Sequence, residues 1–385
     1  MSLELFRNKI QQFSYPIREL ALESERLYRP ADEFVYNPYF KPLQLFKTPK
    51  RYWDGIKLEN GDVSYGETAL ETVIFVEEIA FGDPSLYLAL PGPNLSAALV
   101  ASLGTRDQQD TFFGHFLNEV SWSAFSLTEP NAGSDAVNLK TTALKQSNGS
   151  FKLTGTKQYI ANGAFSDWFI VFASIKSHDE SEKNTNSLFI ETFLFHEKDS
   201  HQILKTYDKT LGQRAARLGK IEFNDYQAAP ESILGYDKRP LKRGFRGALS
   251  TFYHMRPATA AIAIGTSRAA IEYVETHQSL TLSEEIQLAK LKWKLDRGRL
   301  LTLNAAKQCD QGVYSSKSSS LAKQYMNKLV LEITRYCLKI TGYDGMQQHP
   351  LLEKWMRDAH MIEFMEGSTN IHKLEVGRQL IINGV

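Results

Sequence analysis

The sequence contains few cysteines. Only Cys309 and Cys337 occur among its 385 residues, and they do not form a C-x-x-C pair. Two such residues cannot build a disulfide framework or a zinc site of the usual type. The nine histidines also show no metal-ligand spacing. We therefore expect a protein of a reducing compartment that holds no metal.

An excess charge of either sign is missing as well. The chain has 45 Lys and Arg against 44 Asp and Glu, a formal net charge of +1. Nucleic acids and membrane surfaces are usually bound by a clustered basic excess, so we predict neither as a partner. No apolar run reaches the roughly 18 residues of a membrane span. Residues 1–7 do not resemble a secretory signal, and the expected location is cytoplasmic.

The hydrophobic pattern divides the chain into three blocks in the order α, β, α. Apolar residues at helical spacing predict helices at 3–27, 66–81, 84–103 and 107–118, with an irregular connection at 30–53. From about residue 119, runs typical of strands occur at 121–128, 139–144, 151–153, 168–175, 187–195 and 218–223, with an Asn-Gly hairpin signal at 148–149. Helical spacing returns at 255–275, 282–312, 318–341 and 350–365, before a last helix that Ser368 or Thr369 can cap. This order indicates an α+β fold.

The first segment with chemical potential is 125–135, F-S-L-T-E-P-N-A-G-S-D. A β-run ends there in a proline, and a Gly-Ser turn at Gly133 and Ser134 follows. Such a turn exposes N–H groups and hydroxyls that suit a phosphate or a ring carbonyl. A plain turn explains the same residues.

The second segment is 155–163, G-T-K-Q-Y-I-A-N-G. Tyr159 stands at a strand end before an Asn-Gly turn, where an aromatic ring can stack on a flat cofactor. A core tyrosine before a turn is the alternative.

The third segment joins M-R-D-A-H at 356–360 to M-E-G-S-T-N-I at 365–371. Glu366 precedes Gly367 at a break between helices, where the glycine lets the backbone approach a ligand closely. The N-terminus of the next helix offers free N–H groups and a partial positive charge. Desolvation by a ligand would raise the pKa of the Glu366 carboxyl towards that of a useful base. Alternatively, Glu366 only interacts with the helix end.

Other polar residues allow plainer interpretations. Arg256, before Pro257 at the start of an apolar helix, can hold an anion or pair with a buried carboxylate. The neighbours Arg357 and Asp358 are expected to form a structural ion pair. Capping or surface positions are expected for three histidines, His349, His360 and His372.

Together, the three segments resemble the acyl-CoA dehydrogenase family. The T-E-P-x-A-G-S-D string and the R-D-A string followed by E-G-[ST] are specific for it, and the likeness extends from about residue 66 to the end. The resemblance implies an N-terminal helical domain (1–118), a small middle β-barrel or sandwich domain (119–235) and a C-terminal four-helix-bundle domain (236–385).

The resemblance also implies FAD as cofactor and an acyl thioester as substrate. Glu366 matches the glutamate that removes the α-proton while a hydride leaves the β-carbon for flavin N5. Substrate contacts are implied for Ser134, Arg256 and Gly367. Positions near the FAD are implied for Phe125, Leu127, Thr128, Gly133, Ser134, Tyr159, Ile160, Ala161, Ser368 and Asn370. The electrons then pass to a flavoprotein or to oxygen.

Departures from the family pattern add two alternatives. Tyr159 replaces a tryptophan, and Ala161 lacks a hydroxyl that commonly meets the flavin. The residues of a common FAD contact across a subunit interface are also changed, at His277, Leu280 and Tyr343. The adenosine end of FAD is then held differently, and a homodimer is favoured over a tetramer. One alternative is therefore a flavin-poor, non-catalytic scaffold.

The other alternative concerns the carrier of the acyl group. Tyr253 stands where the family commonly has an aspartate that contacts the CoA adenine. This change points to a group bound to an acyl carrier protein.

Overall fold

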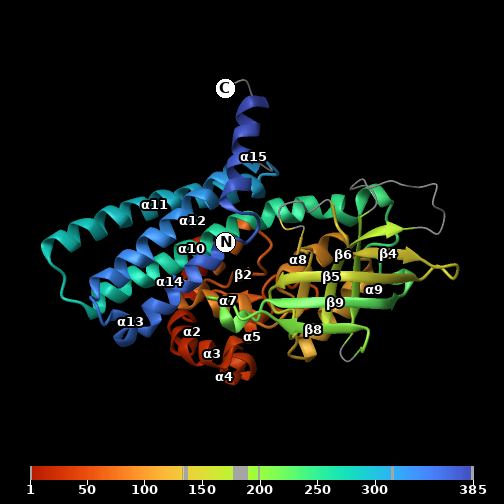
Figure 1. The fold of residues 1–385 in the computed structure, drawn as a ribbon, viewed down its shortest axis with the longest axis horizontal. Helices are drawn as coiled ribbons and strands as arrows, with labels where there is room; N and C mark the ends of the chain where they lie inside the picture. The colour runs from red at the N-terminus through yellow and green to blue at the C-terminus, as the bar shows by residue number, and fades with distance from the viewer. Residues whose placement is uncertain are drawn as a thin grey trace.

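The structure is a computed structural model of the chain. It describes residues 2–131, 133, 138–176, 190–197, 200–313 and 316–382. The expected α+β class is confirmed: N-terminal helices, a central sheet and a C-terminal helical bundle follow one another along the chain, with the sheet at one end of the molecule (Figure 1).

The N-terminal block is a series of short helices. They are α1 (Leu3–Gln11), α2 (Ser14–Glu19), α3 (Ala21–Leu27), α4 (Asp32–Tyr36), α5 (Lys41–Gln44), α6 (Ala69–Gly82), α7 (Pro84–Ala89), α8 (Asn94–Leu103) and α9 (Arg106–Asn118), with the two-residue strands β1 (Ile56–Lys57) and β2 (Val63–Ser64) before α6. The single helix expected over 3–27 is wrong, because three short helices occupy it. The helix expected over 84–103 is also divided. Its break contains Gly92 at φ +118°, where a Cβ atom would lie 2.1 Å from the carbonyl oxygen of Gln44.

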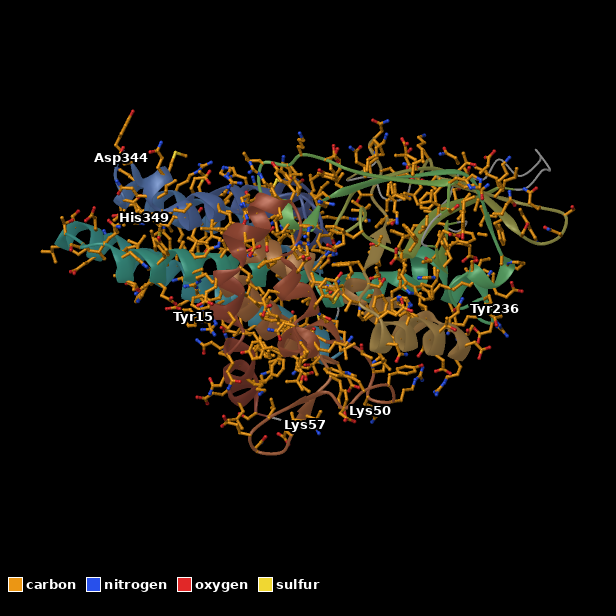
Figure 2. The ribbon with its side chains drawn as sticks, turned by 90° about the horizontal axis from the view of Figure 1, so that it is seen from below. Tyr15, Lys50, Lys57, Tyr236, Asp344 and His349 are labelled. Carbon is orange, nitrogen blue, oxygen red and sulfur yellow. The ribbon has the colours of Figure 1, made fainter. Side chains whose placement is uncertain are left out.

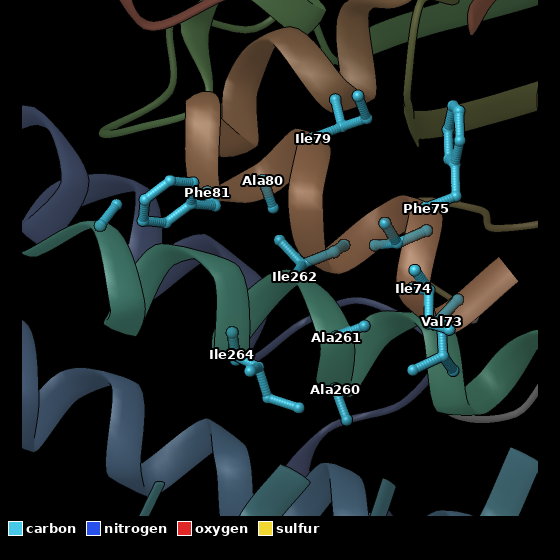
Figure 3. Packing of buried hydrophobic residues seen from close by; sticks show 14 of the residues in the cluster. Val73, Ile74, Phe75, Ile79, Ala80, Phe81, Ala260, Ala261, Ile262 and Ile264 are labelled. Atoms are coloured by element: carbon cyan, nitrogen blue, oxygen red, sulfur yellow. The ribbon is translucent and has the colours of Figure 1, made fainter. Parts of the chain in front are cut away.

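Helix α6 lies at the centre of the helical part. Every residue from Thr72 to Gly82 is buried, which is typical of a helix that is covered on all sides. Gly265 of α10 allows close approach, since a Cβ atom there would lie 2.3 Å from the carbonyl oxygen of Glu77. Figure 3 shows the resulting contact between α6 and α10, with the labelled side chains Val73, Ile74, Ala80, Ala261 and Ile262. The N-terminal and C-terminal helices thus share one hydrophobic core, and the domain boundaries after 118 and 235 remain a prediction.

The middle block forms one seven-stranded sheet in the order β3-β6-β4-β5-β9-β8, with β7 paired to β6. Its strands are β3 (Ser123–Ser126), β4 (Thr142–Lys145), β5 (Phe151–Ile160), β6 (Trp168–Lys176), β7 (Ile190–His196), β8 (Ile203–Tyr207) and β9 (Gly219–Ala228). The sequence pattern missed β8, whose side chains are mostly solvent-accessible, so the strand carries little apolar signal. It also ended β5 too early, because Gly155 and the buried Lys157 interrupt the apolar alternation.

The sheet is covered on both faces. Trp168, Ile170 and Phe172 of β6 pack in a cluster with α8 and α9. The alternate side chains of β6, Phe169, Val171 and Ala173, belong to a second cluster on the concave face of the sheet. In this cluster Phe195 of β7 stacks on Tyr226 of β9, with 4.7 Å between ring centroids. This curvature agrees with the expected barrel-like or sandwich-like character.

The C-terminal block consists of α10 (Gly244–His277), α11 (Leu282–Asp310), α12 (Ser316–Ile340), α13 (Gly345–Gln348), α14 (Pro350–Ile362) and α15 (Thr369–Ile382). Helix α10 begins earlier than predicted and extends from the sheet into the bundle (Figure 1). Helix α15 points away from the body of the molecule (Figure 1). Asp344 and His349 lie at the end of the molecule opposite Tyr236 (Figure 2). Within the described ranges, no helix combines the length and the apolar character needed to cross a bilayer.

A buried ion network joins α7, α14 and the loop before β9. The Lys354 ammonium is fully buried and lies 2.5 Å from Asp83 Oδ2 and 2.7 Å from Asp358 Oδ2. The other carboxylate oxygens of these two aspartates accept backbone N–H groups: Asp83 Oδ1 accepts those of Ser85 and Leu86 at the start of α7, and Asp358 Oδ1 accepts that of Gln213 at 2.5 Å. The network therefore fixes three distant segments relative to one another.

The expected Arg357–Asp358 pair does not form. Asp358 pairs with Lys354, one helical turn away, whereas Arg357 lies 2.7 Å from Glu25 and 2.6 Å from Glu353. Neighbouring residues of a helix point in different directions, so each finds its own partner.

Replacing Lys354 with methionine should destabilise the protein strongly. The change leaves Asp83 and Asp358 buried without their cation, and breaking a buried pair in this way costs about 3–5 kcal/mol. Urea unfolding followed by circular dichroism measures the loss, and Lys290→Met, at an exposed position of α11, is the control. Equal unfolding midpoints for the two variants would contradict the role of the network.

Candidate active site

Glu366 lies in the break between α14, which ends at Ile362, and α15, which begins at Thr369. Its backbone is left-handed, with φ +50°, and Gly367 follows at φ +99°. A left-handed residue other than glycine is unfavourable and persists only where its surroundings hold it. Such residues concentrate at functional sites, so the conformation of Glu366 marks the break as a candidate site.

The helix end beside Glu366 is capped by a different carboxylate. Glu363 accepts the backbone N–H of Thr369 at 2.7 Å and the Thr369 hydroxyl at 2.6 Å. No hydrogen bond joins the Glu366 carboxylate to another residue in the part of the chain that the structure describes. Capping therefore falls to Glu363, which removes the plainer interpretation of Glu366.

Part of the Glu366 side chain is accessible to solvent, but protein atoms surround most of its carboxyl group. Burial raises the pKa of its carboxyl, while the nearby charges of Arg256 and Lys323 act in the opposite direction. Burial also raises the pKa of Tyr87 on α7, and the charge of Glu366 raises it further. Glu366 is thus a reachable carboxyl group between two cations and a tyrosine, with a pKa shifted towards the range of a general base.

Arg256 of α10 lies close to carboxylates. Its charge contributes to lowering the pKa of Glu375 on α15 and opposes the rise in the pKa of Glu366. This placement favours the carboxylate-pairing interpretation of Arg256.

The first and second sequence segments meet at the ends of β3 and β5. The buried Lys157 ammonium donates to Glu129 Oε1 at 2.9 Å and to the carbonyl of Leu127 at 3.1 Å. The N–H of Gln158 donates to the carbonyl of Thr128 at 3.0 Å. These bonds bring the partly exposed side chains of Phe125, Leu127 and Thr128 towards the strand end that carries Tyr159.

Glu129, the acidic residue of the T-E-P string, is therefore structural. It also accepts the N–H groups of Lys140 at 2.6 Å and Thr141 at 2.9 Å. Burial acts to raise the pKa of Glu129, but Lys157 and these hydrogen bonds outweigh it and hold the pKa below its usual value.

Tyr159 is 56% exposed and has φ +61°, so its interpretation as a core tyrosine is wrong. Ile160 is buried and pairs with Gly219, and Ala161 is partly exposed. The side chain of Asn162 donates to the carbonyl of Leu88 on α7 at 2.7 Å. The charge of Glu366 acts on Tyr87 of the same helix, so α7 has neighbours both in the break and at the strand ends. The residues at those strand ends are called the strand-end group: Phe125, Leu127, Thr128, Tyr159, Ile160 and Ala161.

The other predicted site residues are placed less uniformly. Gly133 is exposed, and Ser134 lies outside the described residues. Gly367 and Ser368 share the break with Glu366 and are partly exposed, whereas Asn370 is exposed on α15. The structure thus brings the first two segments together at the ends of β3 and β5, and it keeps Glu366, Gly367 and Ser368 of the third segment together in the break.

Four residues of this region escaped the sequence interpretation: Tyr87, Lys323, Glu363 and His372. A capping or surface position was expected for His372, but it is 1% exposed and its Nδ1 lies 3.0 Å from the Ser320 hydroxyl. Glu363 lies six residues before Thr369, which is not the spacing of a capping box, so no signal in the sequence identifies it as the cap of α15. Lysine and tyrosine in a helical pattern give no signal either.

Comparison with known proteins decides the family. Residues 124–226 match the family "acyl-CoA dehydrogenase, middle domain", and residues 242–381 match "acyl-CoA dehydrogenase, C-terminal domain". The chain belongs to the acyl-CoA dehydrogenase family. The probable medium-chain specific acyl-CoA dehydrogenase 2, mitochondrial, of Caenorhabditis briggsae is 29% identical over 331 residues, which are 82% of this chain and 77% of that protein.

Two solved structures show the same fold. Butyryl-CoA dehydrogenase from Megasphaera elsdenii has a TM-score of 0.81 and 23% identity, with 98% of both chains covered. The prolyl acyl carrier protein oxidase AnaB has a TM-score of 0.77 and 20% identity, again with 98% of both chains covered.

Members of the acyl-CoA dehydrogenase family are FAD-dependent oxidoreductases, and this chain is such an enzyme. The interpretation as a flavin-poor, non-catalytic scaffold is therefore overturned. The strand-end group fits a flavin: it offers accessible apolar and aromatic side chains at Phe125, Leu127 and Tyr159, and the buried hydroxyl of Ser126 has no hydrogen-bond partner. Flat cofactors bind to such mostly apolar surfaces with a few polar groups.

The pH dependence of stability should report the burial of His372. Burial, followed by the charges of Lys323 and Arg256, lowers the pKa of His372 from 6.5 to about 4. Between these values the unfolded chain binds a proton that the folded chain does not. Stability should therefore fall as the pH drops from 6.5 towards 4, by up to about 3 kcal/mol.

Urea unfolding at several pH values, for the native protein and for His372→Gln, measures this effect. The variant should lose the His372 share of the slope, while the carboxyl groups contribute equally to both proteins. Identical slopes would show that His372 is protonated at the same pH in the folded and unfolded chains.

Proposed function

We propose that this enzyme catalyses the α,β-dehydrogenation of an acyl thioester, with Glu366 as the general base. The observation that carries the proposal is the state of Glu366: a reachable carboxyl group in a left-handed break, without a hydrogen-bond partner among the described residues and with a raised pKa. A group that must take a proton needs a free oxygen and a pKa near the working pH.

In the proposed reaction, the Glu366 carboxylate takes the α-proton of the acyl group while a hydride leaves the β-carbon, and a carbon–carbon double bond forms between them. Bound FAD supplies the acceptor for that hydride. Gly367 presents no side chain, so the thioester can come close to the backbone of the break. Binding of an apolar acyl chain would displace water from Glu366 and raise its pKa further.

We also propose roles for the strand-end group. Phe125, Leu127, Thr128, Tyr159, Ile160 and Ala161 would hold the flavin ring, with Gly133, Ser134, Ser368 and Asn370 close to it. Ser134, Arg256 and Gly367 would lie along the path of the thioester. A homodimer is part of this proposal, and the exposed apolar side chains Leu374 and Ile381 of α15 support it. Asp344 lies at the end of the molecule opposite Tyr236 (Figure 2), so a contact of that end with bound FAD would come from a second subunit. The electron acceptor would be a flavoprotein or oxygen.

Replacing Glu366 with glutamine should slow flavin reduction by an acyl thioester by about 10²- to 10⁴-fold, the usual contribution of a general base. Glutamine keeps the size of the side chain but cannot accept the proton. Stopped-flow absorbance at the flavin band measures the rate, and the spectrum before mixing confirms that FAD stays bound. Glu285→Gln, at an exposed position of α11, is the control. An unchanged rate of flavin reduction in Glu366→Gln would contradict the role of Glu366 as general base.

A second candidate function keeps the chemistry and changes the carrier. Tyr253 stands where the family commonly has an aspartate near the CoA adenine, and its side chain lies outside those that the structure describes. An acyl group carried by the phosphopantetheine of an acyl carrier protein would not need that contact.

For this candidate, kcat/KM with an acyl carrier protein substrate should exceed that with the same acyl group on CoA by at least about tenfold, which is about 1.4 kcal/mol of differential transition-state binding. Tyr253→Asp should raise kcat/KM for the CoA ester only. A preference of the native enzyme for the CoA ester would contradict the carrier-protein hypothesis, but it would not contradict the proposed dehydrogenation.

A further inference from the structure

A buried polar cluster lies behind Glu366, on α12, and the proposed reaction does not use it. Lys323 is fully buried, and its ammonium donates to Asn327 Oδ1 at 2.7 Å and to the carbonyl of Ile362 at 2.6 Å. Asn327 lies one turn further along α12. Its side-chain amide donates to Glu363 Oε2 at 3.0 Å and to the Thr369 hydroxyl at 3.2 Å.

These contacts hold the break from both sides. Ile362 is the last residue of α14, and Thr369 is the first of α15. The last carbonyls of a helix have no donor within the helix, and here a charged group satisfies one of them. Helix α12 thus fixes both ends of the short segment in which Glu366 adopts its left-handed backbone.

Lys323 is also one of the charges that act on Glu366. The titratable or charged groups around this carboxyl are Tyr87 from α7, Arg256 from α10, Glu363 from the break, and His372 and Glu375 from α15, together with Lys323 itself. The two cations, Arg256 and Lys323, favour the ionised form of Glu366. Burial lowers the pKa of Lys323 to about 7, against the opposing charges of Glu363 and Glu366, so Lys323 is charged on the acidic side of neutrality.

We propose that Lys323 is a positioning residue for Glu366: through Ile362 and Asn327 it holds both ends of the break, and it places a positive charge near the Glu366 carboxylate. The inference rests on the proposed role of Glu366 as base. A buried ammonium is costly unless it is compensated, so its place here calls for such a role.

The test compares holoenzyme variants by the pH dependence of flavin reduction. In Lys323→Met the acidic limb of the profile should move to higher pH by about one unit, because a cation near Glu366 is lost. Its maximal rate should fall at least about tenfold with little change in KM. Lys328→Met, at an exposed position of the same helix, should leave both unchanged.

A second variant separates geometry from charge. Asn327→Leu keeps the Lys323 ammonium and its bond to the Ile362 carbonyl, but it removes the bond from Lys323 to Asn327 and the bonds from Asn327 to Glu363 and Thr369. It should lower the maximal rate without moving the acidic limb. If Lys323→Met does not retain flavin, Asn327→Leu alone tests whether the hydrogen bonds from α12 position Glu366.

Two results would overturn the inference. One is an acidic limb and a maximal rate in Lys323→Met equal to those of the native enzyme, and the other is a native rate in Asn327→Leu. Failure of the proposed function looks different: Glu366→Gln would then reduce its flavin at the native rate, or the native enzyme would not be reduced by any acyl thioester.

Discussion

The ammonium of Lys354, enclosed by Asp83 and Asp358, is the interaction on which the candidate site depends. Asp83 is the N-cap of α7. In this helix the carbonyl of Leu88 accepts a hydrogen bond from Asn162 near the strand-end group, and the charge of Glu366 raises the pKa of Tyr87. Asp358 belongs to α14, which leads directly into the break with Glu366. Because one buried cation joins both helices, a shift of α14 along the core would break a desolvated ion pair. The Lys354 ion pairs therefore help to fix the position of Glu366 relative to α7.

A buried lysine that joins distant segments occurs at three places in the described residues. Within the residues that the structure describes, the buried lysines are Lys157, Lys323 and Lys354. Lys157 and Lys354 pair with carboxylates, whereas Lys323 donates to an amide oxygen and a backbone carbonyl. Each also lies where segments distant in sequence meet: β3 with β5, α12 with the break, and α7 with α14. Exchanging a buried ion pair for apolar residues is often neutral or favourable, so stability alone does not explain these lysines. Their common feature is that they fix the geometry around the residues proposed to hold the flavin and the thioester, since a charged hydrogen bond adds directionality to packing.

The sequence predicted the parts of this arrangement that are local. The block order, most strands, and Glu366 at a helix break follow from periodicity, from Gly367 and from the family strings. Strand β8 was missed because its side chains carry little apolar alternation. The partners of Arg357 and Asp358 were misassigned because adjacent helix positions point in different directions. Lys323 and His372 look like surface residues in a helical pattern, and only tertiary packing shows that they are buried. FAD contacts at Ser134 and substrate contacts at Arg256 remain predictions.

The break holds two glutamates three residues apart, and their surroundings give them different tasks. Glu363 accepts hydrogen bonds from Thr369 and Asn327, so its oxygen atoms are occupied in holding the start of α15. Glu366 has no such bond among the described residues, and burial raises its pKa. A carboxyl group with a raised pKa and no hydrogen-bonded partner is the one suited to exchange a proton. The cap therefore follows from the contacts of Glu363, and the proposal of Glu366 as base rests on its own surroundings as well as on the family resemblance.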